Sequence, residues 1–271
     1  MKGIAFHDFR SFKWIKHDHG DPRGPPGSVW CSRRICHDAQ FRNVDVKSPR
    51  TVDELQFASE LRSLPDGDGA GGLEIDGDYD RVLFSGSAFA DADAGGARFT
   101  ECAFTGGGFD GGRLRRARLS DVWFGETRLV AVDLAESSLT DTWFSGCVFA
   151  GVQAFSCVGR RVLFRSGKLD SVNFRDSKLT DVTFEDCVLR DVDFGSAKLV
   201  RVRFPGCQFA NVDFTKAACA SVDLRGARLG TADTPGIKAG YDSLSGTRID
   251  SVQLMTIAPL LADHLGIKVT D

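Results

Sequence analysis

The stretch that decides the fold is "SVNFRDSKLTDVTFEDCVLRDVDFGSAKLVRVRF", residues 171–204. Phe or Leu occupies every fifth position from Phe174 to Phe204, and a small or β-branched residue stands two positions before each. A period of five matches neither the 3.6-residue turn of an α-helix nor the alternation of a strand. It predicts a solenoid in which each five-residue unit forms one side of a square coil and then turns.

The same period runs through most of the chain. Every fifth residue from Phe84 to Leu229 gives 30 positions, and 26 of them hold Phe or Leu, the exceptions being Ala94, Ala154, Gly159 and Cys219. Four units make one coil of 20 residues, and coils stacked like parallel strands give a rod about 36 Å long. We therefore predict an all-β solenoid of about seven to eight coils, with the large residues on its axis.

Two features of the predicted core concern its small residues. Ala154 and Gly159 underfill the axis within "GVQAFSCVGRR" (151–161), so we expect a local bend or an inward Phe155. Six cysteines occupy inward positions, where free Cys acts as a small buried hydrophobe: Cys102, Cys147, Cys157, Cys187, Cys207 and Cys219.

Several units resemble the A(D/N)Lxx signature of the pentapeptide-repeat family, among them "VDLRG ARLGT" (222–231), "VNFRD SKLTD" (172–181) and "NVDFT" (211–215). The resemblance covers about residues 82–231 and implies a right-handed quadrilateral β-helix. The best-known activity of that family is binding a type II topoisomerase, DNA gyrase, and relieving quinolone-like poisons, which is an antibiotic-resistance function.

Segments of different composition flank the predicted repeats of residues 73–231. Before them, residues 51–72 read as a short capping helix followed by a Gly-rich link, "PDGDGAGG" (65–72). Thr51 and Glu54 form a capping-box pattern, and Val52, Leu55, Ala58 and Leu61 form an apolar stripe at helical spacing. After the repeats, residues 232–271 contain a helix from about Ser251, stopped or kinked at Pro259 and ended by Gly266.

The ending of the chain resembles the C-terminal helical module of the gyrase-protecting family members, the Qnr-type and mycobacterial fluoroquinolone-resistance proteins. In those relatives the module joins two rods end to end. The resemblance implies a homodimer, and the alternative is a monomeric end cap. The residues that would form the dimer contact are Val252, Met255, Leu260, Leu261 and Leu265.

Residues 1–50 fit neither the repeats nor the capping segments. They carry ten Lys and Arg against five Asp, and we expect either partial disorder or an extension beyond the true start. A zinc site could use His17, His19, Cys31, Cys36 and His37, but the C-x4-C-H spacing fits no common zinc pattern. We therefore predict no metal and no cofactor.

One outward column of the predicted rod is apolar. The residues just before the large residue on one wall are Leu83, Ala103, Trp123, Trp143 and Leu163, after which the column turns polar. A contiguous apolar patch usually marks an interface, and Trp is a typical hot-spot residue. The column predicts either an interaction patch for a second copy or a partner, or a face covered by the protein's own N-terminal helix or by Trp14 and Trp30.

The predicted rod carries acidic stripes, although its net charge is not acidic. The stripes are Glu101, Asp121, Asp141 and Asp181 on one column, and Asp93, Asp133, Asp193 and Asp213 on another. Residues 81–230 nevertheless contain 20 Lys and Arg against 18 Asp and Glu. Imitation of duplex DNA needs a strongly acidic surface, so the charge departs from what the resemblance implies.

These observations predict a non-enzymatic scaffold that binds other proteins. The chain has no G-x-S-x-G elbow, Walker loop or dinucleotide fingerprint, so we expect no catalytic residues. No apolar run is long enough to span a membrane and no secretory signal is apparent, so we expect a cytoplasmic protein. The partner is either a type II topoisomerase or another protein bound without DNA mimicry, and we expect no direct contact with nucleic acid.

Overall fold

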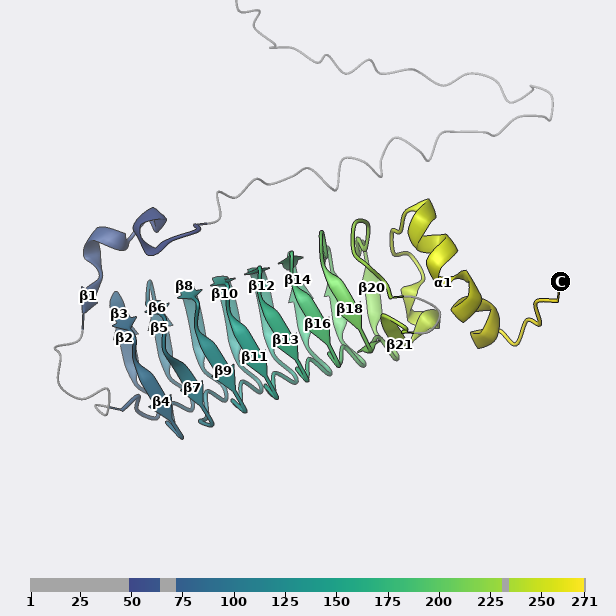
Figure 1. The fold of residues 1–271 in the computed structure, drawn as a ribbon. Coiled ribbons are helices and arrows are strands. Elements are labelled where there is room, and N and C mark those ends of the chain that lie inside the picture. Colours follow the sequence, from purple (N-terminus) through teal and green to yellow (C-terminus); the bar gives the residue numbers. More distant parts are fainter. Residues whose placement is uncertain (1–48, 64–71, 231–233, 271) are drawn as a thin grey trace, which may run out of the picture. The chain divides into compact units, whose positions relative to one another are not determined.

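The computed structural model describes residues 49–63, 72–230 and 234–270. These belong to one compact unit, Val46–Asp271. They form the predicted β-solenoid, with about eight turns and one C-terminal α-helix. Figure 1 shows the strands stacked side by side in sequence order, with α1 (Ser251–His264) after the last coil.

The walls of the solenoid are parallel sheets in which residue i pairs with residue i + 20, for example Trp123 with Trp143. The largest sheet contains β1 (Arg62–Ser63), β2 (Asp78–Asp80), β3 (Val82–Ser85), β5 (Arg98–Thr100), β6 (Ala103–Thr105), β8 (Arg118–Gly125), β10 (Ser138–Ser145), β12 (Val158–Arg165), β14 (Lys178–Thr180), β15 (Thr183–Glu185), β17 (Lys198–Val200) and β20 (Ala218–Ala220). The second contains β4 (Ala88–Ala90), β7 (Gly108–Asp110), β9 (Arg128–Val130), β11 (Val148–Ala150), β13 (Lys168–Asp170), β16 (Val188–Arg190) and β18 (Gln208–Ala210). The register of 20 confirms the predicted coil.

The core consists of stacked aromatic rings along the axis. On one wall Phe164, Phe184 and Phe204 lie parallel, with ring centroids 4.7 and 5.0 Å apart. Phe174 and Phe194 meet this ladder edge-on from another wall. Such stacked and edge-to-face pairs are the preferred aromatic geometries, which explains why the large position is so often Phe.

The corners between walls require a left-handed backbone. Asp121, Asp141 and Asp181 have φ values of 55°, 49° and 56°. Only Gly adopts this region freely, and Asp and Asn tolerate it better than other residues. The recurrence of Gly, Asp and Ser two positions after the large residue of each unit therefore reflects the turn.

The underfilled stretch of the axis does not take in Phe155, so the predicted inward Phe155 is wrong. The side chain of Leu179 occupies the space beside Gly159, where a Cβ would lie 2.9 Å from Leu179 Cδ2. Phe155 stays outside and half-buried, with the Arg115 guanidinium carbon 5.5 Å from its ring centroid. The pairing of β12 with β10 and β14 continues through the region.

The N-terminal cap differs from the predicted helix. It consists of two 3-10 turns, η2 (Val52–Glu54) and η3 (Ala58–Glu60), followed by β1. Thr51 makes no side-chain cap bond, and the Glu54 carboxylate instead accepts from the Arg50 N–H at 2.7 Å. Leu55 is extended because both Leu55 and Phe57 turn toward the rod, which interrupts any α-helix.

The solenoid also continues beyond the predicted boundary at residue 231. β21 (Ile237–Ala239) pairs with β19 (Val212–Asp213). Ile237 lies 25 residues after its partner Val212, and Arg248 lies 25 residues after its partner Asp223, rather than 20. Ile237 is buried in the core. An insertion of five residues therefore precedes a last partial coil, which includes η4 (Tyr241–Leu244).

The helix α1 begins with a capping box between Asp250 and Gln253 and runs through Pro259 without a break. Of the two predicted alternatives at Pro259, a stop or a kink, the stop is wrong. The carbonyl left without its N–H partner, that of Met255, belongs to an exposed residue that water can reach. Gly266 has a φ of 69° and its N–H bonds to the Asp263 carbonyl, which confirms it as the C-terminal cap.

Candidate interaction surfaces

The apolar column lies on the wall formed by β3, β6, β8, β10 and β12, where successive residues pair in register. Part of it is covered. We call residues 49–63 the N-terminal strap; its Leu55 and Phe57 form a buried cluster with Ala103 and Trp123. This cluster is separate from the axial core.

The strap changes which residues of the column are accessible. Ala103 and Trp123 are buried, whereas Leu83, Trp143 and Leu163 remain half-buried. The sequence left open whether the N-terminal segment or another protein covers this face, and Trp14 and Trp30 lie outside the described residues. Phe57 was missed as an anchor because helical spacing placed it off the apolar stripe.

The indole of Trp123 lies over Gly125 on the wall. A Cβ at Gly125 would overlap the ring, so glycine at this position makes room for it. Trp123 is 6% exposed, and its Nε1 has no hydrogen-bond partner among the described residues. Buried polar groups are nearly always hydrogen-bonded, so this donor is an exception within an otherwise apolar contact.

The first acidic stripe is divided by arginines. Arg161 makes two hydrogen bonds of 2.6 Å to Asp141, and Arg201 binds Asp181 in the same bidentate way. The bonds from Arg201 lower the pKa of Asp181. Partial burial and then the neighbouring carboxylates Asp141 and Glu101 raise the pKa of Asp121. The stripe is therefore continuous only over its first three coils.

The carboxylates of the second acidic stripe accept hydrogen bonds within the turns of the rod. One carboxylate oxygen of Asp93, Asp133, Asp193 and Asp213 accepts the backbone N–H two residues later, at 2.7–3.1 Å. This local bond is the Asx turn that favours Asp in turns. Asp193 also pairs with Arg175. These carboxylates are thus occupied in the fold rather than presented as a free negative surface.

The C-terminal helix presents an apolar face to solvent. Val252, Met255 and Leu265 are 71%, 78% and 66% exposed. Leu261 packs partly against the core, and Leu260 is half-buried. Six exposed large apolar residues from Val252 to Val269 make this the main apolar surface of the described chain.

The opposite face of α1 fastens it to the last coil. Gln253 is buried, and its amide donates to the Leu224 and Ala227 carbonyls at 2.6 and 2.7 Å. Ile257 is buried in the same core. Because these contacts fix the helix, its exposed apolar residues are held in place on the rod.

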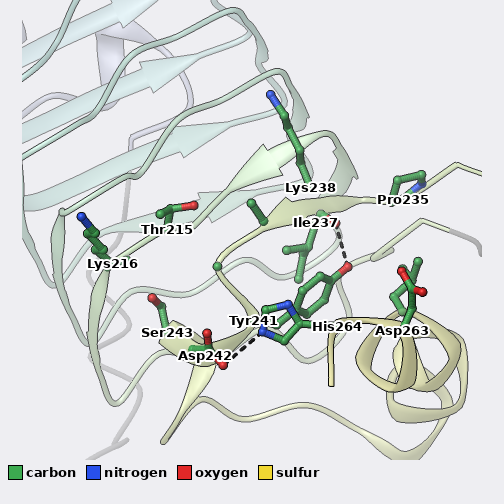
Figure 2. A pocket seen from close by; sticks show the side chains of 14 residues that line it. Thr215, Lys216, Pro235, Ile237, Lys238, Tyr241, Asp242, Ser243, Asp263 and His264 are labelled. Atoms are coloured by element: carbon green, nitrogen blue, oxygen red, sulfur yellow. Dashed lines mark hydrogen bonds and ion pairs between the residues drawn. The ribbon is translucent and has the colours of Figure 1, made fainter. Parts of the chain in front are cut away.

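An open pocket of about 820 Å³ lies between α1 and the last coil, as Figure 2 shows. The Tyr241 hydroxyl donates to the Ile237 carbonyl at 2.8 Å, and His264 Nε2 lies 3.1 Å from Asp242 Oδ1. The Tyr241 and His264 rings are 5.6 Å apart. These contacts hold α1 against the last coil, and the pocket is the gap left between the helix and the coil.

Chemistry-bearing groups elsewhere are few in the part of the chain that the structure describes. It contains no group of three or more metal-ligating side chains and no helix long and apolar enough to cross a membrane. The zinc candidates His17, His19, Cys31, Cys36 and His37 lie outside the described residues. Burial raises the pKa of the Cys147 and Cys157 thiols to about 12, so these groups stay neutral.

Two family models match the chain. One, described as pentapeptide repeats (8 copies), matches residues 83–121 and 113–151, and another, described as a pentapeptide repeat region, matches 159–233. Together these ranges cover more than half of the chain. A comparison with curated proteins gives no match.

Solved structures with similarity include full-length QnrB1, a plasmid-mediated fluoroquinolone resistance protein. It is 16% identical with a TM-score of 0.37, over 70% of this chain and 100% of that one. HetL, involved in heterocyst differentiation regulation in Nostoc sp., is 15% identical with a TM-score of 0.28, over 67% and 93%. Rfr23 from Cyanothece is 12% identical with a TM-score of 0.16, over 65% and 90%.

Proposed function

The chain belongs to the pentapeptide-repeat family, and from that premise we propose that it is a non-enzymatic, cytoplasmic scaffold that binds other proteins. The proposal includes a homodimer formed through α1. The observation that carries it is the apolar face of α1 and the tail after it, where Val252 and Met255 are more than two-thirds exposed.

Physical reasoning supports an interface at that face. Large exposed apolar patches on soluble proteins mark interaction sites, and a helix already fixed by buried bonds loses little further freedom on binding. Because α1 lies at the end of the rod, a two-fold contact between two copies would place their rods end to end (Figure 1). Such an isologous contact is the commonest way in which soluble proteins form dimers.

Light scattering on the full chain tests this contact. The wild type should have about twice the 29.4 kDa mass of one chain, and Val252→Lys combined with Met255→Lys should return it to a monomer. Ser251→Lys combined with Thr270→Lys is the matched control, since it adds the same charge at exposed polar positions nearby. A wild type that stays monomeric at high concentration would refute the dimer.

A type II topoisomerase is the specific partner that we propose for the scaffold. The support is the resemblance of residues 249–266 to the module of gyrase-protecting relatives. The walls argue against imitation of DNA, because Arg161 and Arg201 neutralise carboxylates one coil away. A topoisomerase contact would therefore depend on shape and on apolar residues rather than on negative charge.

The test is a DNA gyrase supercoiling assay with purified protein, with and without a quinolone. Inhibition of supercoiling, or protection from the quinolone, at micromolar protein supports the assignment. If neither occurs while the dimer is present, a type II topoisomerase is excluded as the partner. The scaffold would then bind a different protein without imitating DNA.

A further inference from the structure

We infer that the wall bearing Trp123 is a peptide-binding face, occupied by the protein's own N-terminal strap until a segment of a partner protein displaces it. The inference rests on the proposed scaffold function. It concerns the end of the rod away from α1 (Figure 1), so the two surfaces can be tested separately.

The strap's backbone is attached to the rod by few hydrogen bonds. Its backbone forms only 3-10 turns and a two-residue ladder, in which Arg62 and Ser63 pair with Val82 and Leu83. An exposed ion pair links Glu60 to Arg81. Elements held by few and exposed backbone hydrogen bonds open at the low end of a protein's local stability range.

The wall beneath the strap does not depend on it for its own structure. Ala103 and Trp123 belong to strands that pair on both sides in the main sheet, and the phenylalanines beside them are buried in the axial core. The cluster under the strap is separate from that core. Removing the strap would therefore expose an intact apolar surface rather than unfold the coils.

The indole N–H of Trp123 shows what the strap does not supply. The side chain is 94% buried, and Nε1 has no acceptor among the described residues. A buried donor without an acceptor loses its hydration without replacement. A bound segment that places a carbonyl or carboxylate oxygen there would gain a hydrogen bond that the strap lacks.

The strap itself indicates the chemistry of the partner. Leu55 and Phe57, two positions apart, fill the apolar face, and Glu60, three positions later, reaches Arg81. The partner is therefore a protein segment that can adopt the strap's turns, with two large apolar side chains two positions apart and a carboxylate three positions after the second. It also carries an oxygen acceptor for Trp123.

The experiment uses the full chain and a fluorescein-labelled peptide with the sequence of residues 50–63. Phe57→Asp releases the strap by burying a charge that the cluster cannot solvate. Gln56→Asp is the matched control, because it adds the same charge at the exposed position between the two anchors. Fluorescence anisotropy then gives the affinity of each variant for the peptide.

We expect Phe57→Asp to bind the peptide at least about tenfold more tightly than wild type or Gln56→Asp, since a tethered strap competes at about millimolar effective concentration. Adding Trp123→Ala to Phe57→Asp should weaken binding about tenfold or more. Trypsin should also cleave after Arg62 faster in Phe57→Asp than in the control.

Equal peptide binding by Phe57→Asp and Gln56→Asp would overturn the inference, as would binding that ignores Trp123→Ala. A wild-type dimer that Phe57→Asp splits would assign the face to a second copy and overturn it also. Circular dichroism checks that the coils remain folded, and Leu55→Asp repeats the test if they do not. If Phe57→Asp does not bind the peptide but the α1 dimer forms, the peptide-binding face is refuted and the proposed function stands. If the peptide binds but no α1 dimer forms, only the dimer is contradicted.

Discussion

Replacing Phe184 by Ala tests whether the stacked rings hold the rod together. The Phe184 side chain is fully buried. Its ring lies 4.7 Å from that of Phe164 and 5.0 Å from that of Phe204, and it meets Phe174 and Phe194 edge-on. Deleting a buried Phe costs about 3–5 kcal/mol, because the transfer free energy is lost and a cavity remains.

The ladder places Phe184→Ala near the middle of that range, at a loss of about 4 kcal/mol in the free energy of unfolding. The rings above and below are held by their own strands, so they cannot collapse into the gap. Thr183→Ala is the control, because Thr183 is the preceding residue on the same strand, faces outward and is half-buried. It should cost less than about 1 kcal/mol.

Urea unfolding monitored by far-ultraviolet circular dichroism measures both losses. Hydrogen exchange locates them, since stability in a solenoid depends on each coil and its neighbours. We expect exchange to rise most in the strands that pair with β15. A loss below about 1.5 kcal/mol for Phe184→Ala, or one no larger than that for Thr183→Ala, would refute the view that the ring ladder stabilises the rod.

Four further predictions concern charge, close packing and hydrogen bonding. Burial and nearby carboxylates raise the pKa of Asp121 above its unfolded value. Ionising Asp121 in the folded protein therefore lowers the free energy of unfolding as pH rises through its folded pKa. Asp121→Asn should accordingly not lower the urea midpoint at neutral pH. Bonds from arginine lower the pKa of Asp181, so its contribution is present at neutral pH and lost in acid, and Asp181→Asn should cost up to about 1 kcal/mol. Gly125→Ala should displace the Trp123 indole and shift tryptophan emission to longer wavelength, and an unchanged spectrum would count against the packing. Gln253→Ala leaves two carbonyls of the last coil without their donor and should destabilise the attachment of α1 by about 1–3 kcal/mol, seen as faster exchange in α1 alone.

The repeat was predictable because the same physical requirement recurs in every unit. Each coil needs a large apolar residue on the axis and a small one beside it, so the five-residue spacing indicated which residues are buried. The same spacing placed Trp123 and Trp143 side by side on the outer wall, as β8 and β10 confirm. The register of 20 follows from the constant length of the units.

The ends were harder to predict because contacts between distant residues decide them. Leu55 and Phe57 leave helical spacing to reach Trp123, an effect that the strap's own sequence does not reveal. At the other end, five inserted residues keep the five-residue count but break the 20-residue coil spacing, so the sequence does not show that Ile237 pairs with Val212. Sequence also does not show which carboxylates serve turns, as Asp193 does.

The measurement that tests the proposed scaffold most directly is small-angle X-ray scattering of the wild-type chain beside the Val252→Lys, Met255→Lys variant. If the apolar face of α1 joins two rods end to end, the longest dimension should exceed about twice the 36 Å that seven and a half coils span. It should then fall by roughly half in the variant. The same longest dimension in both proteins, or a wild-type dimer no longer than one rod, would contradict the account.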